Sequence, residues 1–592
     1  MPSKTGKNRR RVVVFGLLGP AACLALAGGW SARLGLSVRE HLQATKEALR
    51  NLPVSDPARL GGALAVAQRH AAEARRLTSG LDWSLLAGAP VTGDGATTVR
   101  GLAESAAELT DVLAGVHRAG AGLLQAGGFS MDDMGRLLDG LDSAAPALDA
   151  ATARIDRTRA RLAVTPAETG LDELDEARGT ALHELDRLHG WLGAASDAAA
   201  LLPPMLGHEG PRRYFLAFQT NAEARATGGL VGAFGILKAG RGGLGVEHLS
   251  ANNGLRTSRA PVVDHGPAYR ARYGRHSLSM LSVSNLSPHF PYAAATWTAL
   301  WEQQTGRRLD GAIATDPVGL SHLLRLIGPV TLPSGEKVTS ENVVDLTERQ
   351  AYARYQDPEA RKRFLIRIAG TVSEALTHAR PEPEKVLPVL SEMVRSRRLQ
   401  VWSRREAEQQ RLAATPLGGV LPREPGPYAA LVINNSAGNK LDYYLDRQME
   451  YRLGPCRADG YRVSRVRVRL TNDVPRRKLP EYVTSRLDQR DHDRSPGSNL
   501  LWVSLYTAVG ARNGGVWIDG RSTRVIEAVE ESHPVLTTVL EFAPRQSRTL
   551  EFHLLEPASA ANAVVPVQPL ARRQQTRVVL DRTGCVPESP PR

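Results

Sequence analysis

Cysteine and aromatic residues are scarce in this chain of 592 residues. It has three cysteines, and Phe, Trp and Tyr together make up 5% of its residues. Cys23 lies in an apolar N-terminal stretch, which leaves Cys456 and Cys585 for the remainder of the chain. In an oxidising compartment these two could form a disulfide between the beginning and the end of the C-terminal region; the alternative is a pair of free buried thiols.

Several chemical motifs are also lacking. The histidines are scattered without the spacing of zinc ligands. The sequence has no Gly-x-Ser-x-Gly elbow, and its Gly-rich stretch at 228–238 lacks the Gly-Lys-Ser/Thr of a phosphate loop. These absences speak against a zinc enzyme, a hydrolase of the nucleophile-elbow type and a P-loop nucleotide hydrolase.

The charge is strongly positive, and arginine supplies most of it. The formal net charge is +14, with 23% charged and 42% hydrophobic residues, and this composition is globular. A chain of this length predicts two to four folded units. Without a zinc spacing, an RNA-binding motif or a basic recognition helix, no nucleic acid partner is expected. Anionic lipid head groups, polyprenyl phosphates and wall polymers fit better, unless the charge only reflects genomic composition.

The N-terminus has the pattern of a membrane anchor. Residues 1–11 contain a basic cluster, and residues 12–32 carry no charge. At ~1.5 Å per residue that stretch covers roughly 31 Å, enough to cross the hydrocarbon layer. Cations on its N-terminal side predict a cytoplasmic tail, one transmembrane helix in the cell membrane, and an extracytoplasmic bulk in contact with membrane lipid. The alternative is a signal peptide cleaved near Ala25–Ala27, and this alternative also exports the protein.

Beyond residue 32 the pattern predicts a multidomain α+β protein. Leucines at helical spacing predict a helical stalk or bundle over 36–200, with breaks near 90–96, 127–133 and 164–170 and with Pro146 in the first turn of a helix. Strand-like and helical runs alternate over 205–415 and predict an α/β domain. Short strands over 428–582 predict a β-sandwich-like domain. Residues 583–592 are expected to be a flexible tail.

The most informative motif is Asn221 to Gly229, in which Asn-x-Glu-x-Arg precedes paired glycines. Glycine permits close backbone approach, and Arg225 could reach an anion there; the alternative is a structural turn with a surface ion pair. This stretch resembles the bacterial domain-of-unknown-function 4012 family. The resemblance continues, in order, through Ser284–Pro291, Leu309–Pro317, Gly328–Val330, Thr339–Val343 and Asn434–Asp442. It implies a membrane-anchored architecture and no established activity.

A more distant resemblance brings a mechanism with it. The order Asp310, Asp316, Gly328–Val330, then Tyr352–Arg354, Asp357 and Arg361–Arg363 is similar to the LytR-CpsA-Psr phosphotransferases, which transfer polyprenyl-pyrophosphate-linked glycopolymers to the cell wall. The resemblance implies Mg²⁺ as a cofactor. It assigns the phosphate to Arg225, Arg354, Arg361 and Arg363, and catalysis or metal binding to Asp310, Asp316 and Asp357. Phe364 stands where those enzymes have Gln.

The alternative is that this segment has only a structural role, as a solvated basic helix with Asp357 as its N-cap and Pro358 in its first turn. The working hypothesis is therefore a membrane-anchored envelope protein that binds or transfers a polyprenyl-phosphate-linked glycan, with a cell-wall polymer as a further partner. The alternative is a non-catalytic scaffold or interaction protein. Transfer requires the four arginines to converge on one cleft beside the aspartates.

Overall fold

A computed structural model describes residues 29–53, 56–90, 92–124, 134–476, 478–488 and 495–585. The predicted cytoplasmic tail, residues 12–28 of the predicted transmembrane helix and residues 586–592 of the predicted flexible tail lie outside these ranges. Within them, no helix combines the length and apolar character that a bilayer crossing needs. The chain divides into two compact units, Met1–Gly128 with Asp133–Gly210, and Phe129–Asp132 with Pro211–Arg592.

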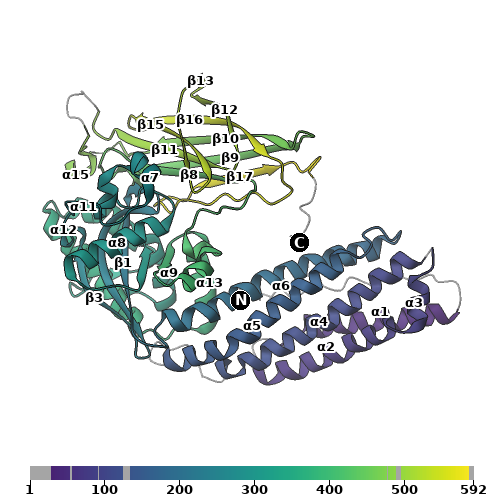
Figure 1. Cartoon of the computed structure of the whole chain (residues 1–592). Coiled ribbons are helices and arrows are strands. Elements are labelled where there is room, and N and C mark those ends of the chain that lie inside the picture. The colour runs from purple at the N-terminus through teal and green to yellow at the C-terminus, as the bar shows by residue number, and fades with distance from the viewer. Residues whose placement is uncertain are drawn as a thin grey trace, which may run out of the picture. The chain divides into compact units, whose positions relative to one another are not determined.

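The first unit consists of five long helices that lie alongside one another and one short helix, α3, among the described residues (Figure 1). They are α1 (Gly29–Arg50), α2 (Pro57–Thr78), α3 (Leu81–Ala87), α4 (Gly93–Leu124), α5 (Met134–Ala163) and α6 (Asp172–Met205). Leucines and alanines at helical spacing form one core, and alanine lets the helix backbones approach closely. With 32 residues, α4 is about 48 Å long at ~1.5 Å per residue.

Two details of the helical prediction are wrong. Pro146 lies inside α5, which begins at Met134, and not in the first turn of a helix. The last helix does not end near residue 200: α6 continues through Pro203 and Pro204 to Met205.

The second unit begins with a five-stranded sheet of order β3-β2-β1-β4-β7. Its strands are β1 (Arg212–Arg225), β2 (Gly228–Gly240), β3 (Gly243–Ala251), β4 (Gly311–Thr315) and β7 (Leu399–Ser403). β1 and β4 are parallel, and the other neighbours are antiparallel. One face packs on α8 (Phe290–Thr305) through an aromatic core that includes Phe215, Phe234 and Trp297. The side chains of α9 (Pro317–Ile327) and α12 (Pro358–Thr377) form a separate core with the short elements between them.

Short elements complete this region. They are α7 (Gly266–Tyr273), β5 (Val330–Thr331), β6 (Lys337–Val338), α10 (Val343–Asp345), a π-helical turn (Leu346–Gln350), α11 (Ala351–Arg354), α13 (Pro383–Arg395) and α14 (Glu406–Ala413). The mixture of parallel and antiparallel strands with helices makes this part a mixed α/β sheet domain.

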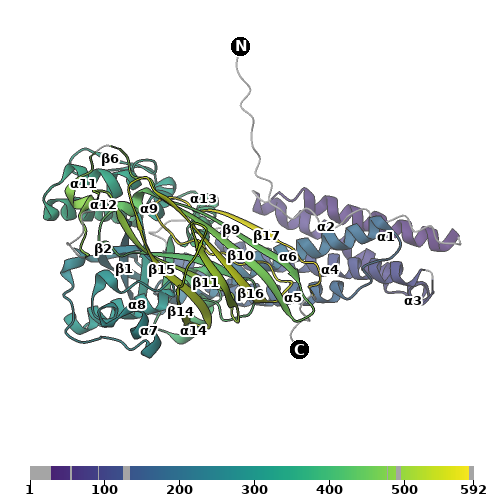
Figure 2. The ribbon, with the colours of Figure 1, turned by 90° about the horizontal axis from the view of Figure 1, so that it is seen from above.

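The remainder of the second unit forms two mainly antiparallel sheets (Figure 2). The six-stranded sheet has the order β13-β12-β16-β10-β9-β17 and the four-stranded sheet has the order β14-β15-β11-β8. The strands are β8 (Ala429–Asn435), β9 (Leu445–Cys456), β10 (Tyr461–Asn472), β11 (Asn499–Thr507), β12 (Arg512–Ile518), β13 (Arg521–Ser522), β14 (Ile526–Glu530), β15 (His533–Phe542), β16 (Ser547–Pro557) and β17 (Gln575–Leu580); the short α15 (Glu481–Thr484) precedes β11.

Alternate residues of both sheets enter one hydrophobic core, for example Val503 on β11 and Val466 on β10. This follows from the two-residue period of a strand. Cys456, at the end of β9, is joined to Cys585, just beyond β17, by a disulfide that spans 129 residues of sequence. The structure thus contains the disulfide between the predicted pair of cysteines.

Candidate functional site

The Asn221 to Gly229 motif forms a bulge near the end of β1 and then the two-residue turn, Ala226–Thr227, that leads into β2. In the pairing of β1 with β2, Thr220 opposes Leu230 but Ala224 opposes Gly229, so residues 221–223 have no partner on β2. A Cβ on Gly229 would lie 1.9 Å from the Thr220 carbonyl oxygen, so this close approach admits only glycine. The bulge turns backbone N–H groups away from the sheet, and they need other acceptors.

Glu348 supplies an acceptor for two of these groups. Its carboxylate accepts hydrogen bonds from the backbone N–H of Asn221 (3.2 Å) and of Ala222 (2.7 Å), and from the Thr220 hydroxyl (2.8 Å). Glu348 is buried and lies in the π-helical turn between α10 and α11. Burial raises the pKa of its carboxyl to about 7, although the three hydrogen bonds favour the charged form.

Asp316 is committed to neighbours on several sides. It caps α9 by accepting from the Gly319 N–H at 2.8 Å, and it forms a buried ion pair with Arg398 at 2.5 Å. The Asn221 side chain donates to Asp316 at 3.1 Å and to the Pro569 carbonyl at 2.9 Å. This predicted catalytic carboxylate therefore holds a helix end, the bulge and the C-terminal region together.

Arg225 is also engaged within the protein. It forms a buried ion pair with Glu223 at 2.7 Å and donates to the carbonyls of Ser282 and Asn435. Lys440 reaches the other oxygen of Glu223. Burial opposes ionisation of Glu223, but the two cations outweigh it and lower its pKa.

Three of the other family-like segments contact the bulge or the turn beside it. Asp442 accepts from the Ala224 N–H at 2.7 Å and from the side chains of Asn435 and Asn499. The Asn285 amide donates to Thr227 and to the Gly229 carbonyl, each at 2.8 Å. Segments that are far apart in sequence therefore converge on one buried polar junction between the mixed sheet and the C-terminal sheets. We call it the bulge junction; it consists of residues 219–229, Asn285, Asp316, Glu348, Arg398, Asn435, Lys440 and Asp442.

The remaining predicted site residues are not brought together. Arg361 is buried against the rings of Tyr352 and Tyr482, at 5.1 and 3.8 Å. Arg354 forms a solvent-accessible pair with Glu336 at 2.7 Å. These two arginines thus occupy different surroundings, one inside the protein and one at its surface.

The last three predicted residues serve local roles. Arg363 has a side chain 65% exposed and lies 3.8 Å from Asp357, which caps α12 through the Glu359 and Ala360 N–H groups. Asp310 pairs with Arg212 at 3.2 Å, at the opposite end of β4 from Asp316. All seven predicted phosphate-binding and catalytic residues lie in the described ranges, and they do not share a cleft.

An apolar pocket of about 80 Å³ lies beside Glu348. Its apolar walls come from β1, β2, α9 and α12, and include Phe218, Ala233, Leu320, Leu365 and Ala369. Glu348, Asp316 and Lys362 are the ionisable residues that line it. A few convergent polar groups and a carboxyl of shifted pKa make this apolar pocket a candidate ligand site, and its volume admits only a small group. In the part of the chain that the structure describes, no group of three His, Cys, Asp or Glu side chains is placed to hold a metal ion.

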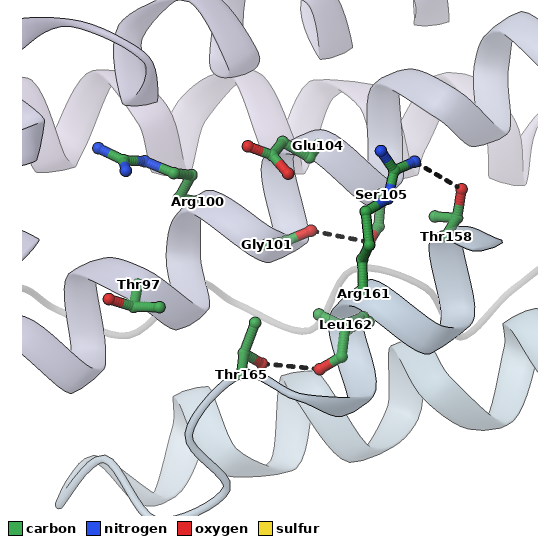
Figure 3. Close-up of a pocket in the computed structure, with 9 residues that line it drawn as sticks. All are labelled: Thr97, Arg100, Gly101, Glu104, Ser105, Thr158, Arg161, Leu162 and Thr165. Carbon is green, nitrogen blue, oxygen red and sulfur yellow. Dashed lines mark hydrogen bonds between the residues drawn. The ribbon is translucent and has the colours of Figure 1, made fainter. Parts of the chain in front are cut away.

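A second pocket, of about 130 Å³, lies between α4 and α5 of the helical unit (Figure 3). Ser105 of α4 and Thr165, just beyond α5, line it and donate to nearby carbonyls, Gly101 at 2.7 Å and Leu162 at 2.8 Å. Arg161 donates to Thr158 at 3.5 Å (Figure 3). Because these hydroxyls are satisfied locally, their hydrogens are not free to orient a ligand.

Comparison with known proteins identifies one family. Residues 209–352 match the family described as "Protein of unknown function (DUF4012)", so the chain contains a DUF4012 domain. The matched stretch includes the bulge, Asp316 and Glu348. The comparisons give no evidence for the expected resemblance to LytR-CpsA-Psr enzymes. No curated protein matches the sequence.

One solved structure aligns, from Legionella pneumophila, described as a "putative nutrient binding protein". It has 5% identity and a TM-score of 0.15, and the alignment covers 23% of this chain and 44% of the other. At this level of similarity the alignment supports no conclusion about fold or function.

Proposed function

We propose that this protein is a membrane-anchored component of the bacterial cell envelope whose DUF4012 domain binds a polyprenyl-phosphate-linked glycan without transferring it. The observation that carries the proposal is the apolar pocket beside the buried carboxyl of Glu348. Its volume suits a short branched apolar group such as the isoprene unit next to the phosphate, and its walls would remove that group from water at a gain of ~25 cal/mol per Å².

Lys362 supports the phosphate part of the proposal. It lines the pocket and pairs with Glu359, three residues earlier on α12, at 2.8 Å. An exposed pair of this kind is worth ~0.3–0.5 kcal/mol, so a phosphate could replace Glu359 at little cost. The ammonium group of Lys362 would then hold the phosphate of a ligand whose adjoining isoprene unit lies in the pocket.

Binding is favoured over transfer because the predicted catalytic and phosphate-binding groups already have partners within the protein. Asp316 is held by Arg398 and a helix end, and Arg225 is held by Glu223. Stabilising a leaving pyrophosphate needs several cations directed at one point, and Arg225, Arg354 and Arg361 have separate surroundings.

Two features support the envelope location. The uncharged residues 12–32 follow a basic cluster, as in a single membrane anchor with the N-terminus in the cytoplasm. The disulfide between Cys456 and Cys585 belongs to the part of the chain that such an anchor would export, where oxidising conditions preserve disulfides.

Binding of undecaprenyl phosphate to the detergent-solubilised full chain tests the proposal. Ala369→Phe should fill the pocket and weaken binding by roughly tenfold or more, because the apolar group is excluded. Ala360→Phe, on the same helix and outside the pocket lining, is the matched control and should bind as the wild type does. Lys362→Ala should weaken binding of the phosphate while leaving binding of the uncharged polyprenol unchanged.

Equal binding by the wild type and Ala369→Phe would overturn the pocket assignment. Failure of the wild type to bind either lipid would favour the scaffold role. Incubation with a polyprenyl-pyrophosphate glycan and Mg²⁺ separates binding from catalysis, and we expect no released polyprenyl phosphate by mass spectrometry. Product formation would support a transferase.

A further inference from the structure

The solvent-facing side of the six-stranded sheet carries a row of arginines. On β10, Val466, Val468 and Leu470 enter the core, so Arg465, Arg467 and Arg469 between them face outward. The strand register places Arg452 of β9 beside Arg465, and Arg577 of β17 in line with Arg467 across β9. We call this surface the arginine face; it consists of Arg452, Arg465, Arg467, Arg469 and Arg577.

The carboxylates on this surface are already shared between cations. Glu450 pairs with Arg452 at 3.1 Å and lies 3.7 Å from Arg577. Glu551 pairs with Arg465 at 3.4 Å and with His553 at 2.9 Å. Both glutamates, which lie on the two strands that flank β10, therefore already have cationic partners.

Arg467 and Arg469 are exposed and have no ion-pair partner among the described residues. Arg467 lies between Glu450 and Glu551 in the register, and the neighbours of Arg469 are the neutral Gln448 and Thr549. Their guanidinium groups, each with five N–H donors, are directed to solvent. Unused donors at two successive outward positions are the groups that a bound anion would engage.

Two open grooves run along the arginine face on either side of Arg467. One, of about 610 Å³, is lined by Arg467, Arg469 and Arg577 together with residues of β9 and β17. The other, of about 500 Å³, is lined by Arg467, Trp517 and His553, and also by Asp519, which pairs with Arg548, and Glu551, which pairs with Arg465. The rings of Trp517 and His553 lie 4.4 Å apart, and they give this groove an apolar wall against which a sugar ring can pack.

We propose that the arginine face binds an anionic glycan polymer, with Arg467 and Arg469 on its carboxylates or phosphates and Trp517 against its sugar rings. Arg467 and Arg469 are ~7 Å apart along the strand, and Arg467 and Arg577 are ~10 Å apart across it, so charges repeated along a chain can be met in succession. An arginine fork matches both carboxylate and phosphate. A chain fits the grooves beside Arg467, whereas a flat bilayer surface does not enter them. The inference rests on the exported location in the proposed function and not on the lipid pocket.

The test measures binding of the detergent-solubilised full chain to immobilised polygalacturonate and to phosphomannan, two anionic polymers of sugar rings, with neutral dextran as the reference. We expect binding to at least one anionic polymer, and weaker binding as ionic strength rises. Arg467→Glu/Arg469→Glu should weaken binding by roughly tenfold or more because it places carboxylates where the polymer has its own. Arg307→Glu/Arg308→Glu makes the same change of charge away from the face and should leave binding unchanged.

Each outcome decides the inference. Preference for polygalacturonate or for phosphomannan identifies the carboxylated or the phosphorylated glycan as the ligand. Equal losses in both double variants would show that only net charge matters and would overturn the face. Displacement by phosphatidylglycerol micelles or by a homopolymeric RNA at equal charge concentration would assign the face to lipid or nucleic acid and also overturn it. Ala369→Phe should keep full polymer binding, and Arg467→Glu/Arg469→Glu full lipid binding, so failure of this proposal is distinguishable from failure of the proposed function.

Discussion

The carboxylate of Glu348 accepts a 2.7 Å hydrogen bond from the backbone N–H of Ala222, a group that the bulge in β1 leaves without a partner on β2. This contact connects the π-helical turn to the central strand of the mixed sheet. Because the same carboxylate lines the apolar pocket, the integrity of the strand and the chemistry of the pocket depend on one side chain.

Removal of Glu348 should destabilise the second unit. In Glu348→Ala the N–H groups of Asn221 and Ala222 lose their acceptor, and each buried unpaired group costs ~1–3 kcal/mol. We expect a loss of about 3 kcal/mol or more, measured by urea denaturation followed by tryptophan fluorescence. Glu374→Ala, at an exposed position on α12, is the control and should change stability by less than ~0.5 kcal/mol. Similar midpoints for the two variants would contradict the role of Glu348.

Stability should fall as the pH rises from about 4.5 to about 7. Burial raises the pKa of both Glu348 and Glu556 from 4.5 to about 7. The folded state therefore binds protons more tightly than the unfolded state. Each group's contribution is complete below its unfolded pKa and is lost as the pH rises through the folded pKa, an effect of about 3 kcal/mol per group at most.

Substitution with glutamine isolates this effect, because it removes the proton while keeping the shape of the side chain. Glu348→Gln and Glu556→Gln should each flatten the fall in melting temperature between pH 4.5 and pH 7. Glu541→Gln, at a partly exposed position on β15, should leave the profile unchanged. A wild-type profile that rises over this interval in the same way as both glutamine variants would refute the assignment.

Local pattern predicted the strands and helices well where burial is one-sided. Alternation at Val463–Leu470 gave β10, and helical spacing of leucines gave the long helices, because each pattern is set by a single face packed on a core. The division between helices, mixed sheet and C-terminal strands followed from where that period changes.

The site was less predictable because its residues are far apart in sequence and meet only in the folded protein. Asn221 to Arg225 attracted attention as an unusual start to a strand, but nothing local reveals that Glu348 and Asp442 accept its N–H groups from 126 and 218 residues away. Glu348 did leave a signal: it stands four residues before Tyr352 on the apolar side of a helical pattern, where a carboxylate needs a partner. Arginine spacing, in contrast, could not separate buried structural arginines from exposed ones.

Alanine substitution of the four predicted phosphate-binding arginines should reduce stability more at the buried positions than at the exposed ones. Arg225→Ala leaves Glu223 with only one of its two cations in the interior, and breaking a buried pair costs ~3–5 kcal/mol. Arg361→Ala removes a cation packed 3.8 Å from the Tyr482 ring centre and should cost ~1–2 kcal/mol.

The exposed pair supplies the matched comparison, since Arg354→Ala and Arg363→Ala should each change stability by less than ~1 kcal/mol. Urea denaturation of the four variants measures the order. Equal losses of stability in Arg225→Ala and Arg363→Ala would show that burial does not determine how much each arginine contributes to stability.

Loss of the disulfide should lower stability in two separable ways. The bond closes a loop of 129 residues, for which the chain-entropy relation gives about 5 kcal/mol as an upper value. The buried Arg462 also donates from Nη2 to Cys456 Sγ at 2.8 Å and to Cys585 Sγ at 2.5 Å. Among the described residues its Nε and Nη1 find no acceptor, so the sulfurs are two of the few acceptors that this guanidinium has.

Cys456→Ser/Cys585→Ser removes the disulfide but keeps hydroxyl acceptors beside Arg462. Cys456→Ala/Cys585→Ala removes the disulfide and the acceptors. The alanine pair should therefore be less stable than the serine pair by ~1–3 kcal/mol, the cost of leaving a buried donor unpaired. Urea midpoints with and without a reducing agent test this: reduction should lower the midpoint of the wild type and leave both double variants unchanged. Equal midpoints for the serine and alanine pairs would mean that Arg462 gains nothing from the sulfurs, and only the loop constraint would remain.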